Sequence, residues 1–176
     1  MTAKSEKFIC EIYPKAKKQV EISPVFITAQ AGLESGWGES RVGVNGLFGE
    51  KAGKDWKGKK VLVKTTEIAK NENQLNWFRG NLPEILSITQ TGRGYYLIHC
   101  KDWFKDFDTI EECLQSHFKL LHSDLFKHAL KNAHDPVAYV KDLQDNKYNY
   151  ATATNYVQVM CSIFPMVEKI VKKYKL

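Results

Sequence analysis

The chain of 176 residues is long enough for one ordinary domain with its own core. Hydrophobic residues make up 43% of it and charged residues 26%, which excludes a disordered, collagen-like or disulfide-dense chain. No apolar stretch approaches the ~18 residues of a transmembrane helix, so we expect no membrane insertion. The N-terminus is charged and has no apolar run behind it, so we expect no secretory signal peptide.

The net charge of +6, from 26 basic and 20 acidic side chains, predicts attraction to polyanions. On this ground both nucleic acid and a bacterial envelope polymer are candidate partners. The lysines are scattered, however, and no recognition-helix motif accompanies them. We therefore expect no nucleic-acid partner, and a basic nucleic-acid binder is kept only as an alternative hypothesis.

The cysteines and histidines show no metal-binding pattern, because the sequence contains neither CxxC nor HExxH. We predict no metal site and no cofactor. His117 falls on an apolar helical face and is expected to be a core histidine with its hydrogen bonds satisfied. Free, buried thiols are expected at the four cysteines, which are Cys10, Cys100, Cys113 and Cys161.

The first predicted helix begins where Ser23 supplies an N-cap and Pro24 occupies the first turn. Residues 25–33 contain no helix breaker before Gly32. Gly36 is a natural helix terminator. The last turn of this helix should therefore carry Glu34.

Glycine is concentrated directly after this helix, since eight of the eleven glycines lie between Gly32 and Gly58. Such clustering fits a place where the backbone turns sharply or approaches a ligand closely. The segment also carries Trp37, Phe48 and Trp56, which a flexible linker would not. A functional site is therefore favoured over a domain boundary, and the phosphate-loop pattern GxxxxGK[ST] is absent.

A β pattern follows the glycine-rich segment. Residues 61–67 alternate and are rich in β-branched side chains, which predicts a strand, and residues 95–100 form a second extended run. The intervening segment 71–94 is polar and contains Pro83 and three glycines. It is expected to be a long connection or an inserted element.

Three further helices are predicted. A capping box opens the helix over 108–121, an Asp-Pro pair opens the next over 135–143, and an apolar stripe marks the last over 157–174. The expected fold class is mainly α (α+β), with a single domain over 1–176 and a small β-lobe at about 45–107.

Glu34 is the leading candidate for catalysis. A carboxylate in the last turn of a helix faces the negative end of the helix dipole, and nearby Trp37 and Phe48 would add desolvation. Both effects raise the pKa of a carboxyl group, and a glutamate that stays protonated near neutral pH can act as a general acid. The alternative is an ordinary surface glutamate at a helix end.

Glu67, at the end of the predicted strand, is the candidate second carboxylate. Two carboxylates that flank a cleft are the groups that glycoside hydrolysis uses. The alternative for Glu67 is an exposed strand-end residue, and Glu39 and Glu50 are its rivals. Aromatic rings stack on sugar faces, and the candidates for that contact are Trp37, Phe48, Trp56, Tyr150 and Tyr156.

Residues 29–38, AQAGLESGWG, and residues 45–49, NGLFG, resemble the signature of glycoside hydrolase family 73. This family comprises peptidoglycan β-N-acetylglucosaminidases, including the flagellar rod-cap type. The resemblance continues in family order and spans residues 24–174, although Ala153 and Thr154 replace the usual Asp-Pro. Its further blocks are WKG at 56–58, TTE at 65–67, WFKDFD at 103–108 and YATATNY at 150–156.

The resemblance implies a lysozyme-like fold with a small β-hairpin lobe beside a catalytic cleft. It implies cleavage of the β-1,4 bond between N-acetylglucosamine and N-acetylmuramic acid in peptidoglycan glycan strands. Glu34 would then be the general acid and Glu67 the second carboxylate, as a base or as an aid to an amide-assisted route. The expected substrate-binding residues are Trp37, Asn45, Phe48, Tyr150 and Tyr156.

An N-acetylmuramidase or lytic transglycosylase on the same polymer is the alternative activity, and a non-catalytic glycan-binding module is the alternative class. A wall hydrolase without a signal peptide is expected to reach the periplasm or the cell exterior through a secretion system or a phage route, unless the sequence is a trimmed domain. An immunity or inhibitor protein is then a candidate partner, with the inserted segment 71–94 as its candidate surface.

Overall fold

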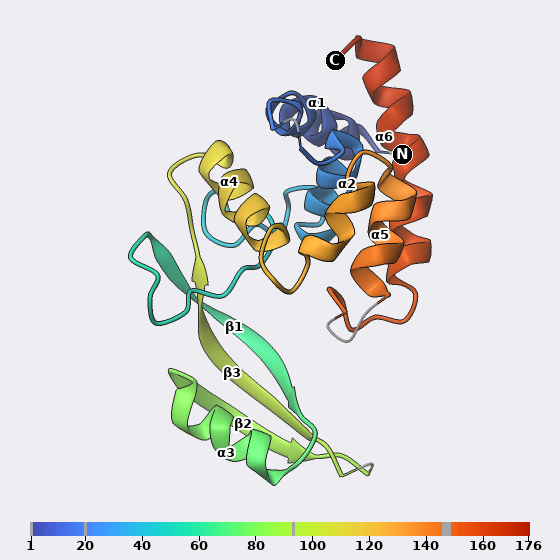
Figure 1. The fold of residues 1–176 in the computed structure, drawn as a ribbon. Helices are drawn as coiled ribbons and strands as arrows, with labels where there is room; N and C mark the ends of the chain where they lie inside the picture. Colours follow the sequence, from blue (N-terminus) through green and yellow to red (C-terminus); the bar gives the residue numbers. More distant parts are fainter. Residues whose placement is uncertain (1, 20, 93, 146–148) are drawn as a thin grey trace. The chain divides into compact units, whose positions relative to one another are not determined.

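A computed structural model describes residues 2–19, 21–92, 94–145 and 149–176. The contacts divide the chain into two compact units. The helical unit combines the chain up to Phe48 with Phe107–Leu176, and the β-lobe is Gly49–Asp106. Figure 1 labels the elements of both units.

The helical unit is built around one central, almost fully buried helix. Its elements are α1 (Ala3–Lys17), α2 (Pro24–Glu34), α4 (Ile110–Leu121), the 3-10 helix η1 (Lys127–Asn132), α5 (Pro136–Gln144) and α6 (Tyr156–Tyr174). Every residue of α2 from Phe26 to Gly32 is buried, and α2 contacts α1, α5 and α6. Phe26 meets Tyr139 of α5 edge-to-face, with ring centroids 4.7 Å apart.

The helix starts that the sequence predicted are confirmed. The Ser23 side chain accepts a hydrogen bond from the N–H of Phe26, and Pro24 occupies the first turn of α2. Thr109 caps α4, and Asp135 accepts from two N–H groups in the first turn of α5. These side chains satisfy backbone donors that the helices leave without partners, so the helix starts are fixed locally.

Helix α1 was not predicted. It contains Pro14, which in a sequence normally argues against a helix interior. A capping box between Thr2 and Ser5 nevertheless starts the helix. Its apolar face, which includes the fully buried Ile9 and Ile12, packs on α2 and stabilises it.

The β-lobe is a three-stranded antiparallel sheet in the order β1-β3-β2. The two predicted strands lie in β1 (Lys60–Ala69) and β3 (Tyr96–Lys105), which pair directly. The inserted segment supplies α3 (Glu72–Asn81) and the third strand, β2 (Glu84–Gln90). Neither element was predicted, because α3 buries only Leu75 and no residue of β2 is fully buried.

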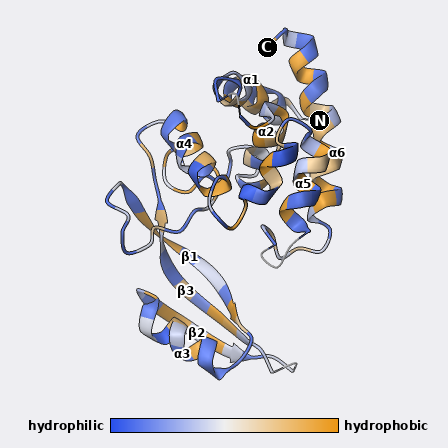
Figure 2. Cartoon of the chain, viewed as in Figure 1, coloured by the Kyte–Doolittle hydropathy of each residue, from blue (hydrophilic) through white to orange (hydrophobic). Residues whose placement is uncertain are grey.

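The core of the β-lobe is small. It consists of Ala69, Leu75, Ile98 and Cys100, with a few partly buried apolar side chains around them. Figure 2 shows hydrophobic and hydrophilic residues interleaved along the elements of both units. A three-stranded sheet needs such a covered face for its stability, and α3 provides the cover.

All four cysteines are free thiols; Cys100 and Cys113 are buried, whereas Cys10 and Cys161 are partly exposed. Among the described residues, no group of three or more His, Cys, Asp or Glu side chains is arranged to hold a metal ion. Within the same residues, no helix combines the length and the apolar character needed to span a membrane.

Candidate active site

Glu34 is the last residue of α2, and an unusual turn follows it. Three consecutive residues, Gly36, Trp37 and Gly38, have left-handed φ angles of 56°, 59° and 85°. The Ser35 hydroxyl donates to a carbonyl one helical turn earlier at 2.6 Å and accepts the Gly38 N–H at 2.9 Å. The turn that carries Glu34 is therefore closed by its own hydrogen bonds.

Trp37 packs this turn against the helices. Its ring lies over Gly32, where an added Cβ would come within 2.5 Å of a ring atom. The backbone N–H of Trp37 donates to the Gly32 carbonyl at 2.7 Å. The ring also meets Phe8 of α1 edge-to-face, with centroids 5.8 Å apart. These contacts hold an aromatic residue in a backbone conformation that L side chains rarely adopt. A substrate contact through the exposed part of the ring stays a prediction.

The carboxyl group of Glu34 is reachable from solvent yet partly dehydrated by the protein around it. This desolvation raises the pKa of Glu34 above its usual range. The negative end of the α2 dipole acts in the same direction. In the described part of the chain no cation forms an ion pair with Glu34, so no paired cation opposes this upward shift.

A chain of buried polar side chains lies beside Glu34. Gln30, one turn earlier on α2, is fully buried. Its Oε1 lies 2.7 Å from Nε2 of the buried His117, and its Nε2 donates to the Tyr156 hydroxyl at 2.8 Å. The pKa of Tyr156 is raised by burial, lowered by the hydrogen bond from Gln30 and raised further by the negative charge of Glu34.

Gln30 was missed by the sequence prediction, although a signal for it exists. It is the only amide side chain in the apolar run of α2, and it precedes Glu34 by four residues, so both lie on one helix face. The prediction for His117 as a core histidine is confirmed, because the ring is buried and bonded to Gln30.

Aromatic rings pack around His117. Phe48 is buried and stacks on the imidazole, with centroids 3.7 Å apart and an angle of 7° between the rings. The half-buried Tyr150 lies edge-on to His117 at 6.1 Å and 5.8 Å from the ring of Tyr156. The structure thus brings Phe48, Tyr150 and Tyr156, three of the expected substrate-binding residues, into one cluster.

Asn45 makes contacts within the helical unit. Its side-chain amide donates to the backbone carbonyls of Phe107 and Asp108, both at 3.0 Å. The N–H of Leu47 points to Sγ of Cys113 on α4 at 3.4 Å. Asn45 therefore fixes the middle of the glycine-rich segment to the residues that precede α4.

In the β-lobe, Glu67 lies on β1 and is half-buried. Its carboxylate pairs with Nζ of Lys51 at 2.6 Å, and the same Nζ lies 2.9 Å from Asp102 on β3. Of the two rivals of Glu67, Glu50 accepts from Lys105 at 2.8 Å. The other rival, Glu39, belongs to the helical unit and pairs with Lys4 at the surface. Lys51 and Asp102 carried no signal in the sequence, because both are common surface residue types.

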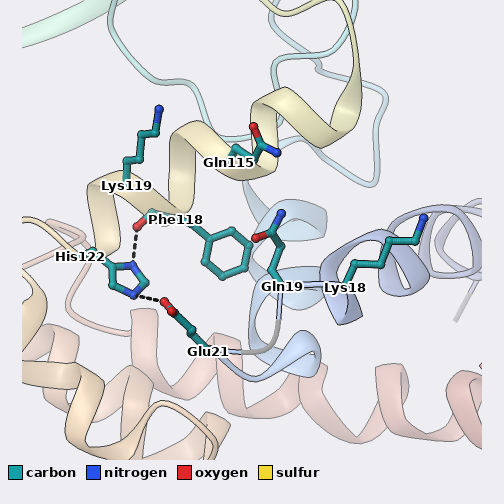
Figure 3. A pocket seen from close by; sticks show the side chains of 7 residues that line it. All are labelled: Lys18, Gln19, Glu21, Gln115, Phe118, Lys119 and His122. Atoms are coloured by element: carbon teal, nitrogen blue, oxygen red, sulfur yellow. Dashed lines mark hydrogen bonds and ion pairs between the residues drawn. The ribbon is translucent and has the colours of Figure 1, made fainter.

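A separate cavity of about 440 Å³ opens at the opposite end of α2 (Figure 3). His122 contacts Glu21 at 2.6 Å, and both residues line the cavity together with the buried Phe118. The start of α2 lies about 15 Å from Glu34, given 1.5 Å of rise per residue. This cavity is therefore distinct from the surroundings of the candidate acid. Its lining consists of Lys18, Gln19, Glu21, Gln115, Phe118, Lys119 and His122.

Comparison with protein families identifies the chain. The model of the glucosaminidase family, described as mannosyl-glycoprotein endo-beta-N-acetylglucosaminidase, matches residues 10–169. The chain belongs to the glucosaminidase family. The match includes Glu34, Glu67 and the aromatic cluster of the helical unit.

Relatives of this glucosaminidase-family chain include the peptidoglycan hydrolase FlgJ of Pseudomonas aeruginosa, which is 25% identical over 93% of the chain and 37% of the relative. FlgJ of Vibrio parahaemolyticus is 24% identical over 94% of the chain and 48% of the relative. The chain thus spans less than half the length of these curated relatives.

Solved structures show the same fold. A C-terminally truncated glycoside hydrolase domain of Salmonella typhimurium FlgJ superposes with a TM-score of 0.65 at 24% identity, covering 94% of this chain and 98% of that truncated domain. The catalytic domain of the autolysin Auto from Listeria monocytogenes gives a TM-score of 0.66 at 25% identity, covering 96% and 86%. The lysozyme-like fold expected from the sequence is confirmed by these neighbours.

Proposed function

We propose that this chain hydrolyses peptidoglycan at the β-1,4 bond between N-acetylglucosamine and N-acetylmuramic acid, with Glu34 as the general acid. The observation that carries the proposal is the Glu34 carboxyl group, which has a raised pKa and no cation paired with it among the described residues, in a chain of the glucosaminidase family. A neutral carboxyl group can protonate the glycosidic oxygen as the bond breaks, which typically contributes ~10²–10⁴-fold to the rate.

Glu67 is proposed as the second carboxylate, because it lies on β1 of the β-lobe and its carboxylate is held by Nζ of Lys51 at 2.6 Å. In this role it either activates the attacking water or stabilises the positive charge that forms when the acetamido group of the substrate attacks the sugar carbon. Glu34 and Glu67 would thus divide the work, one as a proton donor and the other as an anion.

Tyr156 is proposed to hold the sugar or the water beside Glu34. Its hydroxyl accepts the hydrogen bond from Gln30, and Gln30 can present its NH₂ to the phenol only while its carbonyl oxygen faces His117. The phenol proton is then left to donate to the reacting groups. The hydrogen bonds from His117 through Gln30 to Tyr156 therefore leave the Tyr156 hydroxyl as a donor toward the substrate or water.

The other expected binding residues are proposed to shape the substrate surface. Tyr150 is half-buried and presents ring area for stacking on a sugar face. Phe48 is buried and would act indirectly, by stacking on the His117 ring. Asn45 and Trp37 would act through the loops that they fix.

The decisive experiment digests purified peptidoglycan and identifies the new chain ends by mass spectrometry. Reducing N-acetylglucosamine ends are expected. Reducing muramic acid ends would instead show a muramidase, anhydro ends would show a lytic transglycosylase, and binding without turnover would show a glycan-binding module.

A matched pair of variants tests the role of Glu34 in the same assay. Glu34→Gln should abolish lysis while the circular dichroism spectrum stays native. Glu39→Gln, five residues along the same turn, removes a surface carboxyl group paired with Lys4 and should retain most of the activity. Full activity in Glu34→Gln would overturn the proposal.

Peptidoglycan as the substrate places the action of the chain in the periplasm or outside the cell. Delivery by a secretion system or a phage route, and an inhibitor protein bound at the inserted segment 71–94, remain proposals from the sequence. Exposed Trp77 on α3 and Leu86 on β2 give that segment an apolar surface.

A further inference from the structure

Lys51 occupies a fixed place in the β-lobe, although it lies outside the three strands. Its backbone forms an antiparallel bridge with Phe104 on β3. The N–H of Ala52 donates to the Trp103 carbonyl at 2.8 Å, and the N–H of Lys105 donates to the Glu50 carbonyl at 2.8 Å. The segment that carries Lys51 is therefore held to β3 by hydrogen bonds on both sides.

The ammonium group of Lys51 bridges two carboxylates. Nζ lies 2.6 Å from Oε1 of Glu67 and 2.9 Å from Oδ2 of Asp102. The two carboxylates are the less exposed partners, with 21% and 16% of their side chains accessible against 45% for Lys51. A lysine with one carboxylate can swing about it, but a lysine between two carboxylates is restricted from both sides.

The strand register explains why the three groups meet. Thr65 of β1 faces Cys100 of β3, and Asp102 faces the residue two positions before Thr65. Residues two and four positions apart on a strand share a face, so Glu67 and Asp102 lie on one face of the sheet. Two further titratable groups of β3, Tyr96 and Cys100, share this face, and the pKa of the Cys100 thiol is raised by burial and by the charge of Glu67.

We propose that Lys51 is a positioning residue for Glu67 and that Asp102 anchors Lys51. This inference rests on the proposed role of Glu67 as the second carboxylate. A half-exposed ion pair contributes little to folding stability, so the bridging geometry is not explained by stability alone. Held by Lys51, the Glu67 carboxylate keeps a single orientation before the substrate arrives, which is the preorganisation that catalysis needs.

The experiment measures kcat and KM on soluble peptidoglycan fragments. Lys51→Met should lower kcat by about 10- to 100-fold with little change in KM, since misplacing a reacting group by about 1 Å has an effect of this size. Lys51→Arg keeps a cation between the two carboxylates and should recover most of the loss. The matched control is Lys101→Met, which removes an ion pair with Glu84 in the same sheet and should leave both constants unchanged.

A double-mutant cycle then shows whether Lys51 acts through Glu67. The double variant Lys51→Met with Glu67→Gln should be no slower than Glu67→Gln alone. Independent, multiplied losses would overturn the inference, as would wild-type activity in Lys51→Met while Glu67→Gln is inactive; both results leave the proposed function in place. Full activity in Glu67→Gln would overturn the role of Glu67 and the inference together. Melting curves of all variants identify any loss that comes from unfolding.

Discussion

The two units of this protein hold their candidate functional polar groups in opposite ways. In the helical unit, Gln30 and His117 are buried and bonded to each other, and Tyr156 completes the chain with a hydrogen bond from Gln30. In the β-lobe, Glu67 keeps its place through a cation at a half-exposed surface. The first arrangement shields its polar groups from water by burial, and the second places a lysine cation beside the carboxylate.

The difference matches the two tasks of a glycoside hydrolase. A general acid needs a proton to donate, and desolvation at the end of α2 raises the pKa of Glu34, the proposed acid. The proposed second carboxylate, Glu67, has a different environment, because Nζ of Lys51 lies 2.6 Å from it. Glu34 and Glu67 thus have different surroundings, in keeping with the different roles proposed for them.

The largest expected effect comes from Glu34→Gln, which should lower activity by at least ~10²-fold because proton donation is lost. In the wild-type enzyme, activity should fall as the pH rises through the raised pKa of Glu34, since only the protonated form donates. The pH–rate profile of kcat checks this sign. A profile without a basic limb would argue against Glu34 as the acid.

Glu34→Gln should lower the activity but not the stability of the fold. The native state holds the Glu34 proton more tightly than the unfolded chain does, so Glu34 destabilises the fold as the pH rises above its unfolded pKa. Glu34→Gln should therefore melt at an equal or higher temperature at pH 7, and the difference should disappear at low pH. A lower melting temperature at pH 7 would contradict the desolvation argument.

Truncating one core side chain in each unit should show whether the two units unfold independently. Phe26→Ala in the helical unit should lower the free energy of unfolding by ~3–5 kcal/mol, and Leu75→Ala in the β-lobe by ~2–5 kcal/mol. Because the β-lobe core is small, Leu75→Ala should raise hydrogen exchange in β1 and β3 first. Equal acceleration of exchange in α2 would show that the units unfold together.

Gly32→Ala tests the packing that fixes the turn after Glu34. An added methyl group would meet the Trp37 ring at 2.5 Å, so the fold should lose ~1–3 kcal/mol and the activity should fall with it. Adding Trp37→Ala removes the clash, so the two effects should not be additive in denaturant titrations. Additive effects would place the Trp37 ring elsewhere.

The smallest expected effect is the loss of one tyrosine hydroxyl, which should matter at Tyr156 and not at Tyr139. Tyr156→Phe leaves the Gln30 amide without its acceptor and should lower stability by ~1–3 kcal/mol as well as reduce kcat. Tyr139→Phe is the matched control, since the Tyr139 hydroxyl is buried and has no hydrogen-bond partner within the described residues. It should be neutral or stabilising in the same thermal melt, with unchanged activity.

Local signals in the sequence determined most of the helical unit. Ser23, Thr109 and Asp135 satisfy backbone groups within their own first turns, so each helix start can be read from adjacent residues. The same holds for Glu34, because a glycine two residues later ends its helix. The inserted helix and strand were missed because α3 and β2 bury too little apolar surface to show a period.

Only the tertiary structure decided which polar groups meet. Gln30 finds its partners 87 and 126 residues away, at His117 and Tyr156. Lys51 meets Glu67 and Asp102 because separate segments pair with β3. Caps and periodicity depend on neighbours in the chain and are therefore written in the sequence, whereas hydrogen bonds and ion pairs between distant residues depend on how the elements pack.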